Sequence, residues 1–119
     1  MSKLGALVAG IRSHGLRNTA AIVLAYTADY SFDVRYGTDT RSWASLDNLA
    51  IRSVNKQRGE MYQPTLAGPL ARLFRALALP NDSVLVDLGC GKARVLLVAA
   101  QAGVPVVRGV EFSPELCRI

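Results

Sequence analysis

Residues 83–94 have the sequence SVLVDLGCGKAR, in which a short apolar run meets a glycine-rich turn. The run at residues 83–87 lies between a turn and two glycines, which is typical of a buried parallel strand. Gly89 and Gly91 let the backbone turn sharply and come close to a ligand. The helix predicted over residues 92–102 would offer unpaired N–H groups to an electron-rich group.

A second strand and an acidic residue follow this turn. Residues 106–110 predict the strand, and Gly103 is placed to end the intervening helix. Glu111 follows that strand directly, where a carboxylate can accept hydrogen bonds from both hydroxyls of a ribose. Residues 113–115 predict the start of another helix. The order of these elements predicts a βαβ unit that opens a nucleotide-binding sheet.

Two further helical regions precede this unit. Apolar side chains recur at helical spacing over residues 65–79, which predicts an amphipathic helix capped by Thr65 or Gly68. Residues 3–28 predict one helix or two short ones, basic and free of acidic side chains. A membrane-surface helix and an organellar presequence both fit that composition. The apolar run over residues 20–26 favours a helix packed on the following domain.

Residues 29–60 are polar and rich in turn signals, and they predict an ordered loop or lid. Phe32, Tyr36 and Trp43 give this segment aromatic side chains to bury.

The composition indicates one small domain with a packed core. The chain has 119 residues, of which 50% are hydrophobic, and a formal net charge of +5. This length is short for a complete doubly wound enzyme. The positive charge lies in residues 1–80 and would suit nucleic acid, an acidic protein or anionic lipid, but its dispersal favours a solvated surface.

Cysteine usage and hydropathy exclude several classes of protein. Cys90 and Cys117 have no CxxC or Cys/His cluster around them, so we expect no metal and two reduced thiols in a cytoplasmic protein. Basic residues split the apolar runs over residues 4–11 and 19–28, so neither predicts a membrane span. No small-residue cleavage site follows residue 11, which argues against a signal peptide.

Three nucleotide-site motifs compete to explain the glycine turn, and two of them do not fit. A P-loop needs Ser or Thr where Ala93 stands, and the dinucleotide fingerprint needs glycine where Arg94 stands. With Asp87 two positions before Gly89, the turn resembles motif I of class I S-adenosylmethionine-dependent methyltransferases. Residues 109–113 resemble their next motif. The whole pattern is similar to a group of bacterial class I methyltransferases and, more distantly, to the Dot1-type lysine methyltransferases.

This resemblance implies roles for five residues in or beside the two motifs. Gly89 and Gly91 would let the loop pass beside the methionine part of S-adenosylmethionine, and Asp87 would help to hold its amino group. Glu111 would bind the ribose hydroxyls, and Phe112 would lie against the adenine. The competing interpretation is structural, with Asp87 and Glu111 as helix caps and Phe112 as a core residue.

The segment before the amphipathic helix adds two residues to the implied site. The Dot1-type enzymes pair a Tyr-x-x-Thr segment with this kind of loop, and here Tyr62 and Thr65 would close over the cofactor. The family usually has a third glycine where this chain has Ala93.

We expect Lys92 and Arg94 to be solvated charges on the helix surface, and no catalytic residue can be named.

The resulting expectation is an α/β chain with an incomplete Rossmann-like class I methyltransferase fold, made of N-terminal helices and the first βαβ unit. Residues 1–60 would form a helical and lid-like segment, and residues 61–119 the start of the S-adenosylmethionine-binding domain, truncated and inactive alone. Methyl transfer would go by direct displacement to a protein, nucleic acid or small molecule. The alternatives are a non-catalytic truncated product, a small cofactor-binding module, or a fragment of an NAD-binding oxidoreductase.

Overall fold

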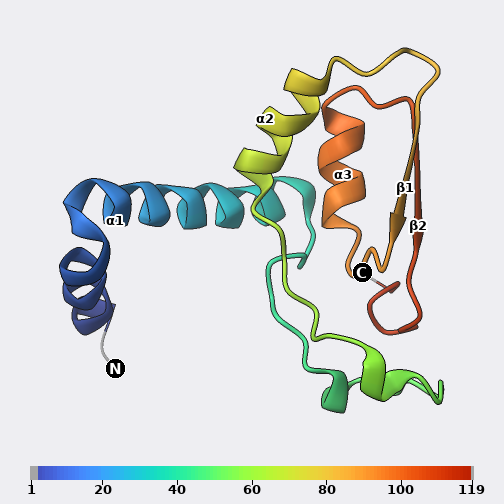
Figure 1. Ribbon diagram of the computed structural model, residues 1–119, viewed down its shortest axis with the longest axis horizontal. Coiled ribbons are helices and arrows are strands. Elements are labelled where there is room, and N and C mark those ends of the chain that lie inside the picture. The colour runs from blue at the N-terminus through green and yellow to red at the C-terminus, as the bar shows by residue number, and fades with distance from the viewer. Residues whose placement is uncertain (1–2, 119) are drawn as a thin grey trace.

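The computed structural model describes residues 3–118. Within that range the chain forms three α-helices, two short 3-10 helices and one two-stranded sheet (Figure 1). The elements are α1 (Lys3–Tyr36), η1 (Leu46–Asn48), η2 (Lys56–Arg58), α2 (Ala67–Leu77), β1 (Val84–Leu88), α3 (Arg94–Gln101) and β2 (Val106–Val110). The architecture is mixed α/β and is compatible with part of an α/β fold.

The two strands are parallel, and α3 connects them. Their register pairs Val84 with Val106 and Leu88 with Val110. The second strand has the predicted bounds, whereas β1 begins one residue later than predicted. Leu85 on β1 contributes to the core that β1 and β2 share with α3. On the opposite face of β1 the side chains are exposed within the described range.

The core lies between α2, α3 and the last turns of α1. Its buried members are Phe32, Ala67, Phe74, Val98, Ala99 and Val104. The predicted amphipathic helix is confirmed as α2, but neither Thr65 nor Gly68 caps it, because the N-cap residue is Leu66. The Asp29 carboxylate caps it from α1 instead, with Oδ1 2.8 Å from the donating N–H of Ala67. A cap supplied by a distant segment has no local sequence signal.

The N-terminal region, α1, consists of two helical segments that meet at a kink. The bend is at Gly15, whose φ of 76° lies in the left-handed region that favours glycine. The prediction of a loop from residue 29 is wrong over residues 29–36, which are helical. Helical spacing places Asp29, Phe32 and Asp33 on one face of α1, and all three are buried. Figure 1 shows the rest of α1 projecting away from the body.

Beyond α1, the predicted loop contains η1, η2 and an antiparallel bridge between Ala44 and Tyr62. Of its predicted buried aromatics only Phe32 is buried, since Trp43 is 59% exposed and Tyr36 is also exposed. The helix predicted to start at residues 113–115 is a turn over residues 114–117. There the Ser113 hydroxyl donates to the Glu115 carboxylate, 3.1 Å away.

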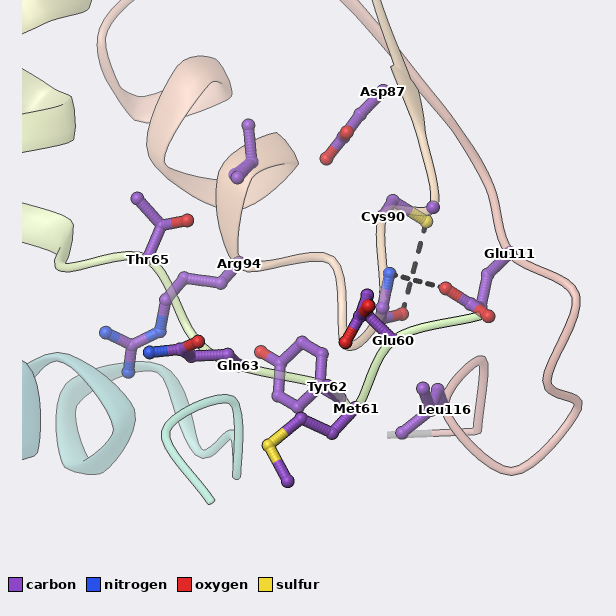
Figure 2. Close-up of a pocket in the computed structure, with 13 residues that line it drawn as sticks. Glu60, Met61, Tyr62, Gln63, Thr65, Asp87, Cys90, Arg94, Glu111 and Leu116 are labelled. Carbon is purple, nitrogen blue, oxygen red and sulfur yellow. Dashed lines mark hydrogen bonds between the residues drawn. The ribbon is translucent and has the colours of Figure 1, made fainter. Parts of the chain in front are cut away.

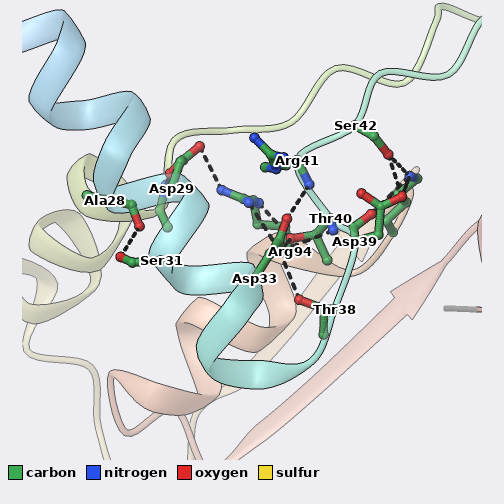
Figure 3. A network of polar contacts seen from close by, with 12 residues as sticks. Ala28, Asp29, Ser31, Asp33, Thr38, Asp39, Thr40, Arg41, Ser42 and Arg94 are labelled. Carbon is green, nitrogen blue, oxygen red and sulfur yellow. Dashed lines mark hydrogen bonds and ion pairs between the residues drawn. The ribbon is translucent and has the colours of Figure 1, made fainter.

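Arg94, the first residue of α3, is the centre of a buried ionic network (Figure 3). The prediction of a surface charge is wrong, because Arg94 is only 2% exposed. Its Nη1 lies 2.7 Å from Oδ2 of Asp29, and its Nη2 lies 3.4 Å from Oδ1 of Asp33. Its Nε donates to Oγ1 of Thr40 at 2.8 Å. One side chain thus joins α3 to both the end of α1 and the segment after it.

Asp33 accepts four further hydrogen bonds from the segment after α1. Its Oδ1 accepts from the Thr38 hydroxyl at 2.8 Å and from the Thr40 hydroxyl at 2.6 Å. The backbone N–H groups of Thr40 and Arg41 donate to the same carboxylate at 3.1 and 2.9 Å. Burial alone raises the pKa of Asp33, but the hydrogen bonds from Thr40, Thr38 and Arg41 outweigh it and hold the pKa below its ordinary value. Asp33 is therefore a stable anion beside Arg94.

Replacing Arg94 with methionine is expected to destabilise the chain by about 3–5 kcal/mol, because two buried carboxylates lose their counter-ion. Chemical denaturation followed by circular dichroism measures this cost. Arg75→Met, an exposed change on α2, serves as the control and is expected to cost less than about 0.5 kcal/mol. Adding Asp29→Asn and Asp33→Asn to Arg94→Met should restore part of the stability. Equal costs for Arg94→Met and Arg75→Met would contradict the role given to the network.

Ala93→Gly is expected to stabilise the chain by about 0.5–1 kcal/mol. This is the strain relieved at Ala93 minus the cost of the greater entropy that glycine has in the unfolded chain. Ala93 precedes α3 with a φ of 62°, a left-handed conformation in which a Cβ is strained. Ala100→Gly, at an exposed helical position of α3, is the matched control and should destabilise by about 1 kcal/mol. A loss of stability in both variants would show that Ala93 is not strained.

Candidate functional site

A cavity of about 350 Å³ lies at the carboxyl ends of β1 and β2, next to the segment that leads into α2 (Figure 2). In open parallel sheets, ligands bind in crevices at this edge. Six of the seven residues predicted for the site line this cavity: Tyr62, Thr65, Asp87, Gly89, Gly91 and Glu111. The fold therefore brings together two segments whose proximity the sequence predicted only by resemblance.

The seventh predicted residue, Phe112, does not line this cavity. It is 48% exposed and borders a separate hollow of about 430 Å³ with Arg52 and Arg118. Its ring packs against Gly59, where an added Cβ would lie 3.0 Å from Cζ of Phe112.

The glycine loop is shaped by left-handed backbone and close approach. Gly89 has a φ of 80° and Gly91 a φ of 53°. The backbone N–H groups of Gly89 and Cys90 both donate to the carbonyl of Val110, at 2.7 and 3.1 Å, which fastens the loop to the end of β2. A Cβ on Gly91 would collide with the ring of Tyr62. Gly91 is thus required both by its φ and by the aromatic ring packed on it.

Glu111 buttresses the loop from the end of β2. Its Oε2 accepts from the N–H of Gly91 at 2.8 Å, and its Oε1 accepts from the N–H of Ser113 at 2.9 Å. A carboxylate has about four lone-pair sites, so each oxygen keeps capacity for another donor. Glu111 can therefore hold the loop and still accept hydrogen bonds from a ligand.

Asp87 lies at the end of β1 and borders the cavity with a carboxylate that accepts no hydrogen bond from any residue of the described chain. Burial raises its pKa, and the negative charge of Glu111 raises it further. A partly buried carboxylate without a donor is suited to a ligand that supplies one, especially a cationic amine.

Tyr62 lines the cavity from the segment before α2, with its ring packed on Gly91 of the glycine loop. Its hydroxyl donates to the carbonyl of Thr40 at 2.6 Å. Burial is the main cause that raises its pKa to about 12. The phenol therefore remains neutral and serves as a fixed wall.

Lys92 lies beside this wall, with Nζ 5.6 Å from the centroid of the Tyr62 ring. It donates to the carbonyl of Asp39 at 2.9 Å, to the carboxylate of the same residue at 3.2 Å, and to the hydroxyl of Ser42. The prediction of a solvated lysine is wrong, since its side chain is only 10% exposed. Lys92 fastens the segment after α1 to the glycine loop.

Both cysteines are free thiols, Cys90 partly buried and Cys117 exposed. Burial, followed by the charges of Asp87 and Glu111, raises the pKa of Cys90 and keeps it a thiol. Across residues 3–118, no three His, Cys, Asp or Glu side chains lie close enough together to hold a metal ion.

Sequence reasoning missed three polar residues that line the cavity: Glu60, Gln63 and Arg94. Gln63 also borders a second cavity of about 540 Å³, which is lined in part by the exposed aromatic residues Tyr26 and Trp43. One signal for Arg94 was present, because Asp29 and Asp33 are four residues apart on a helix otherwise free of acidic residues.

No helix in the described part of the chain is long and apolar enough to cross a membrane. No family model matches the chain, and the searches of curated proteins and of solved structures returned no significant match. A ligand for the cavity is therefore to be inferred from its own residues and from the resemblance of its motifs.

Proposed function

We propose that this cavity binds S-adenosylmethionine and that the chain carries the cofactor half-site of a class I methyltransferase with a Rossmann-like sheet. The observation that carries the proposal is that Asp87, the glycine loop, Glu111 and the Tyr62–Thr65 segment border one cavity at the carboxyl edge of parallel strands. The motif resemblance independently assigns these residues to one ligand.

The chemistry of the cavity fits the two polar ends of this cofactor. Asp87 offers an unpartnered carboxylate to the cationic amino group. Glu111 keeps lone pairs free for the ribose hydroxyls while its other contacts hold Gly91 and Ser113. The space beside Gly89 is open to a ligand, since a Cβ built there would have no other heavy atom within 4 Å. Phe112 lies outside the cavity, so we do not include it among the ligand contacts.

S-adenosylmethionine would supply an activated methyl group for direct displacement. The residues of this chain would orient the donor and exclude water, and the half-buried ring of Tyr62 would cover one side of it. The second cavity, which shares Gln63 with the first, gives a methyl acceptor a place beside the donor.

Isothermal titration calorimetry with S-adenosylmethionine, S-adenosylhomocysteine and NAD tests this proposal. We expect both adenosyl compounds to bind and NAD to bind far more weakly. Glu111→Ala should weaken binding of the adenosyl compounds by about 1–3 kcal/mol, because the ribose hydroxyls lose their acceptor.

The control is Asp82→Ala, which removes an exposed carboxylate outside the cavity and should leave affinity unchanged. Binding of NAD without the adenosyl compounds would favour the oxidoreductase alternative. A well-folded chain that binds none of the three would favour the non-catalytic alternative.

Affinity for S-adenosylmethionine is expected to rise as pH increases through the raised pKa of Asp87, because only the ionised carboxylate pairs with the cationic amine. Binding below that pKa must displace a proton. Titrations from acidic to neutral pH, in buffers of different ionisation enthalpy, measure both effects. Asp87→Asn should bind weakly at every pH and release no proton. A pH profile that is the same in both proteins would mean that Asp87 does not contact the amine.

A further inference from the structure

We propose that α1 docks on an anionic lipid surface, with its outward face in contact with the membrane and its inward face attached to the body of the protein. This proposal is independent of the ligand of the cavity.

Four large apolar side chains are exposed on the outward face of α1 after the bend. Leu16, Val23 and Tyr30 are seven residues apart, so they project from nearly the same side of the helix. Val34 is about 18 residues, or five turns, after Leu16 and projects in the same direction. These side chains are 69%, 47%, 53% and 65% exposed, respectively. Leu24, 70% exposed, borders the same stripe. Exposed apolar side chains aligned over five turns are characteristic of a helix that has a binding surface on that side.

All the formal charge on the exposed surface of α1, over residues 8–36, is positive. Its two acidic residues, Asp29 and Asp33, are 4% and 5% exposed and face Arg94. The exposed charges are those of Arg12, Arg17 and Arg35. Arg17 and Arg35 are about five helical turns apart, so they project in the same direction, and they lie at one edge of the apolar stripe.

The segment after α1 adds another cation at the opposite edge. The guanidinium of Arg41 lies 4.6 Å from the centroid of the Tyr30 ring. An apolar stripe flanked by arginines and tyrosine matches the boundary between acyl chains and anionic headgroups. Each basic residue near such a surface is attracted by it, whereas the apolar stripe would gain little from a nucleic acid.

Within residues 3–118 these side chains are exposed and accessible for the contact. Figure 1 shows α1 joined to the body at its C-terminal end, with the preceding turns projecting from it. Gly15 bends the helix, and exposed Arg12 and Arg17 lie on either side of the bend.

Vesicle flotation of the 119-residue chain tests the proposal. We expect binding to vesicles of phosphatidylcholine with phosphatidylserine, and at least about tenfold weaker binding to phosphatidylcholine alone. The double variant L16S/V23S should bind the anionic vesicles at least about tenfold more weakly. The double variant R17Q/R35Q should lose most of the preference for anionic lipid.

The matched control is V86S, which removes an exposed valine from the sheet and should bind vesicles as the unaltered chain does. Circular dichroism of every variant verifies that helix content is kept. Three outcomes would overturn the proposal: no vesicle binding, equal binding to both kinds of vesicle, or vesicle binding unchanged by L16S/V23S. A dimer that forms without lipid and is abolished by L16S/V23S would instead identify the stripe as a contact between two copies of the chain. Binding of a single-stranded RNA oligonucleotide without vesicle binding would identify it as a nucleic-acid surface.

Discussion

The arrangement of this chain depends on one buried cation. Removing a guanidinium from water costs several kcal/mol, so a buried arginine requires matched counter-charges and hydrogen bonds. Arg94 obtains them from Asp29 and Asp33 on α1 and from Thr40 in the segment that follows. Two carboxylates around one guanidinium leave an excess negative charge. The N–H groups and hydroxyls that surround Asp33, and the N-terminus of α2 at Asp29, offset that excess.

This network also fixes the candidate site. Arg94 begins α3 directly after the glycine loop, so its position sets where the loop turns. Thr40, which contacts Arg94, accepts the hydrogen bond from Tyr62 through its carbonyl, and Tyr62 packs on Gly91. Lys92 makes a second connection between the same segments through Asp39 and Ser42. The cavity therefore lies between parts of the chain that share polar anchors, although they are distant in sequence.

The sequence predicted best what local patterns encode. The strands, α3 and the left-handed glycines follow from short apolar runs and from backbone geometry, and the structure confirms them within a few residues. The proximity of Asp87 and Glu111 follows from parallel pairing of the two strands. The sequence alone predicts a surface position for Arg94, because its partners belong to a helix far away along the chain. Local periodicity cannot identify such a partner. For the same reason the sequence predicts the wrong N-cap for α2, whose first N–H group is bound by Asp29.

The same network determines the outer surface of α1. A helix with Asp29 and Asp33 facing solvent would be close to neutral and would repel an anionic surface in its last turns. Because Arg94 draws both carboxylates inward, the solvent-facing charges that remain over residues 8–36 of α1 are arginines. The ionic interaction that anchors the helix thus also separates its charges by face. A change at Arg94 would therefore act at the core, at the glycine loop and on the outer face of α1 together.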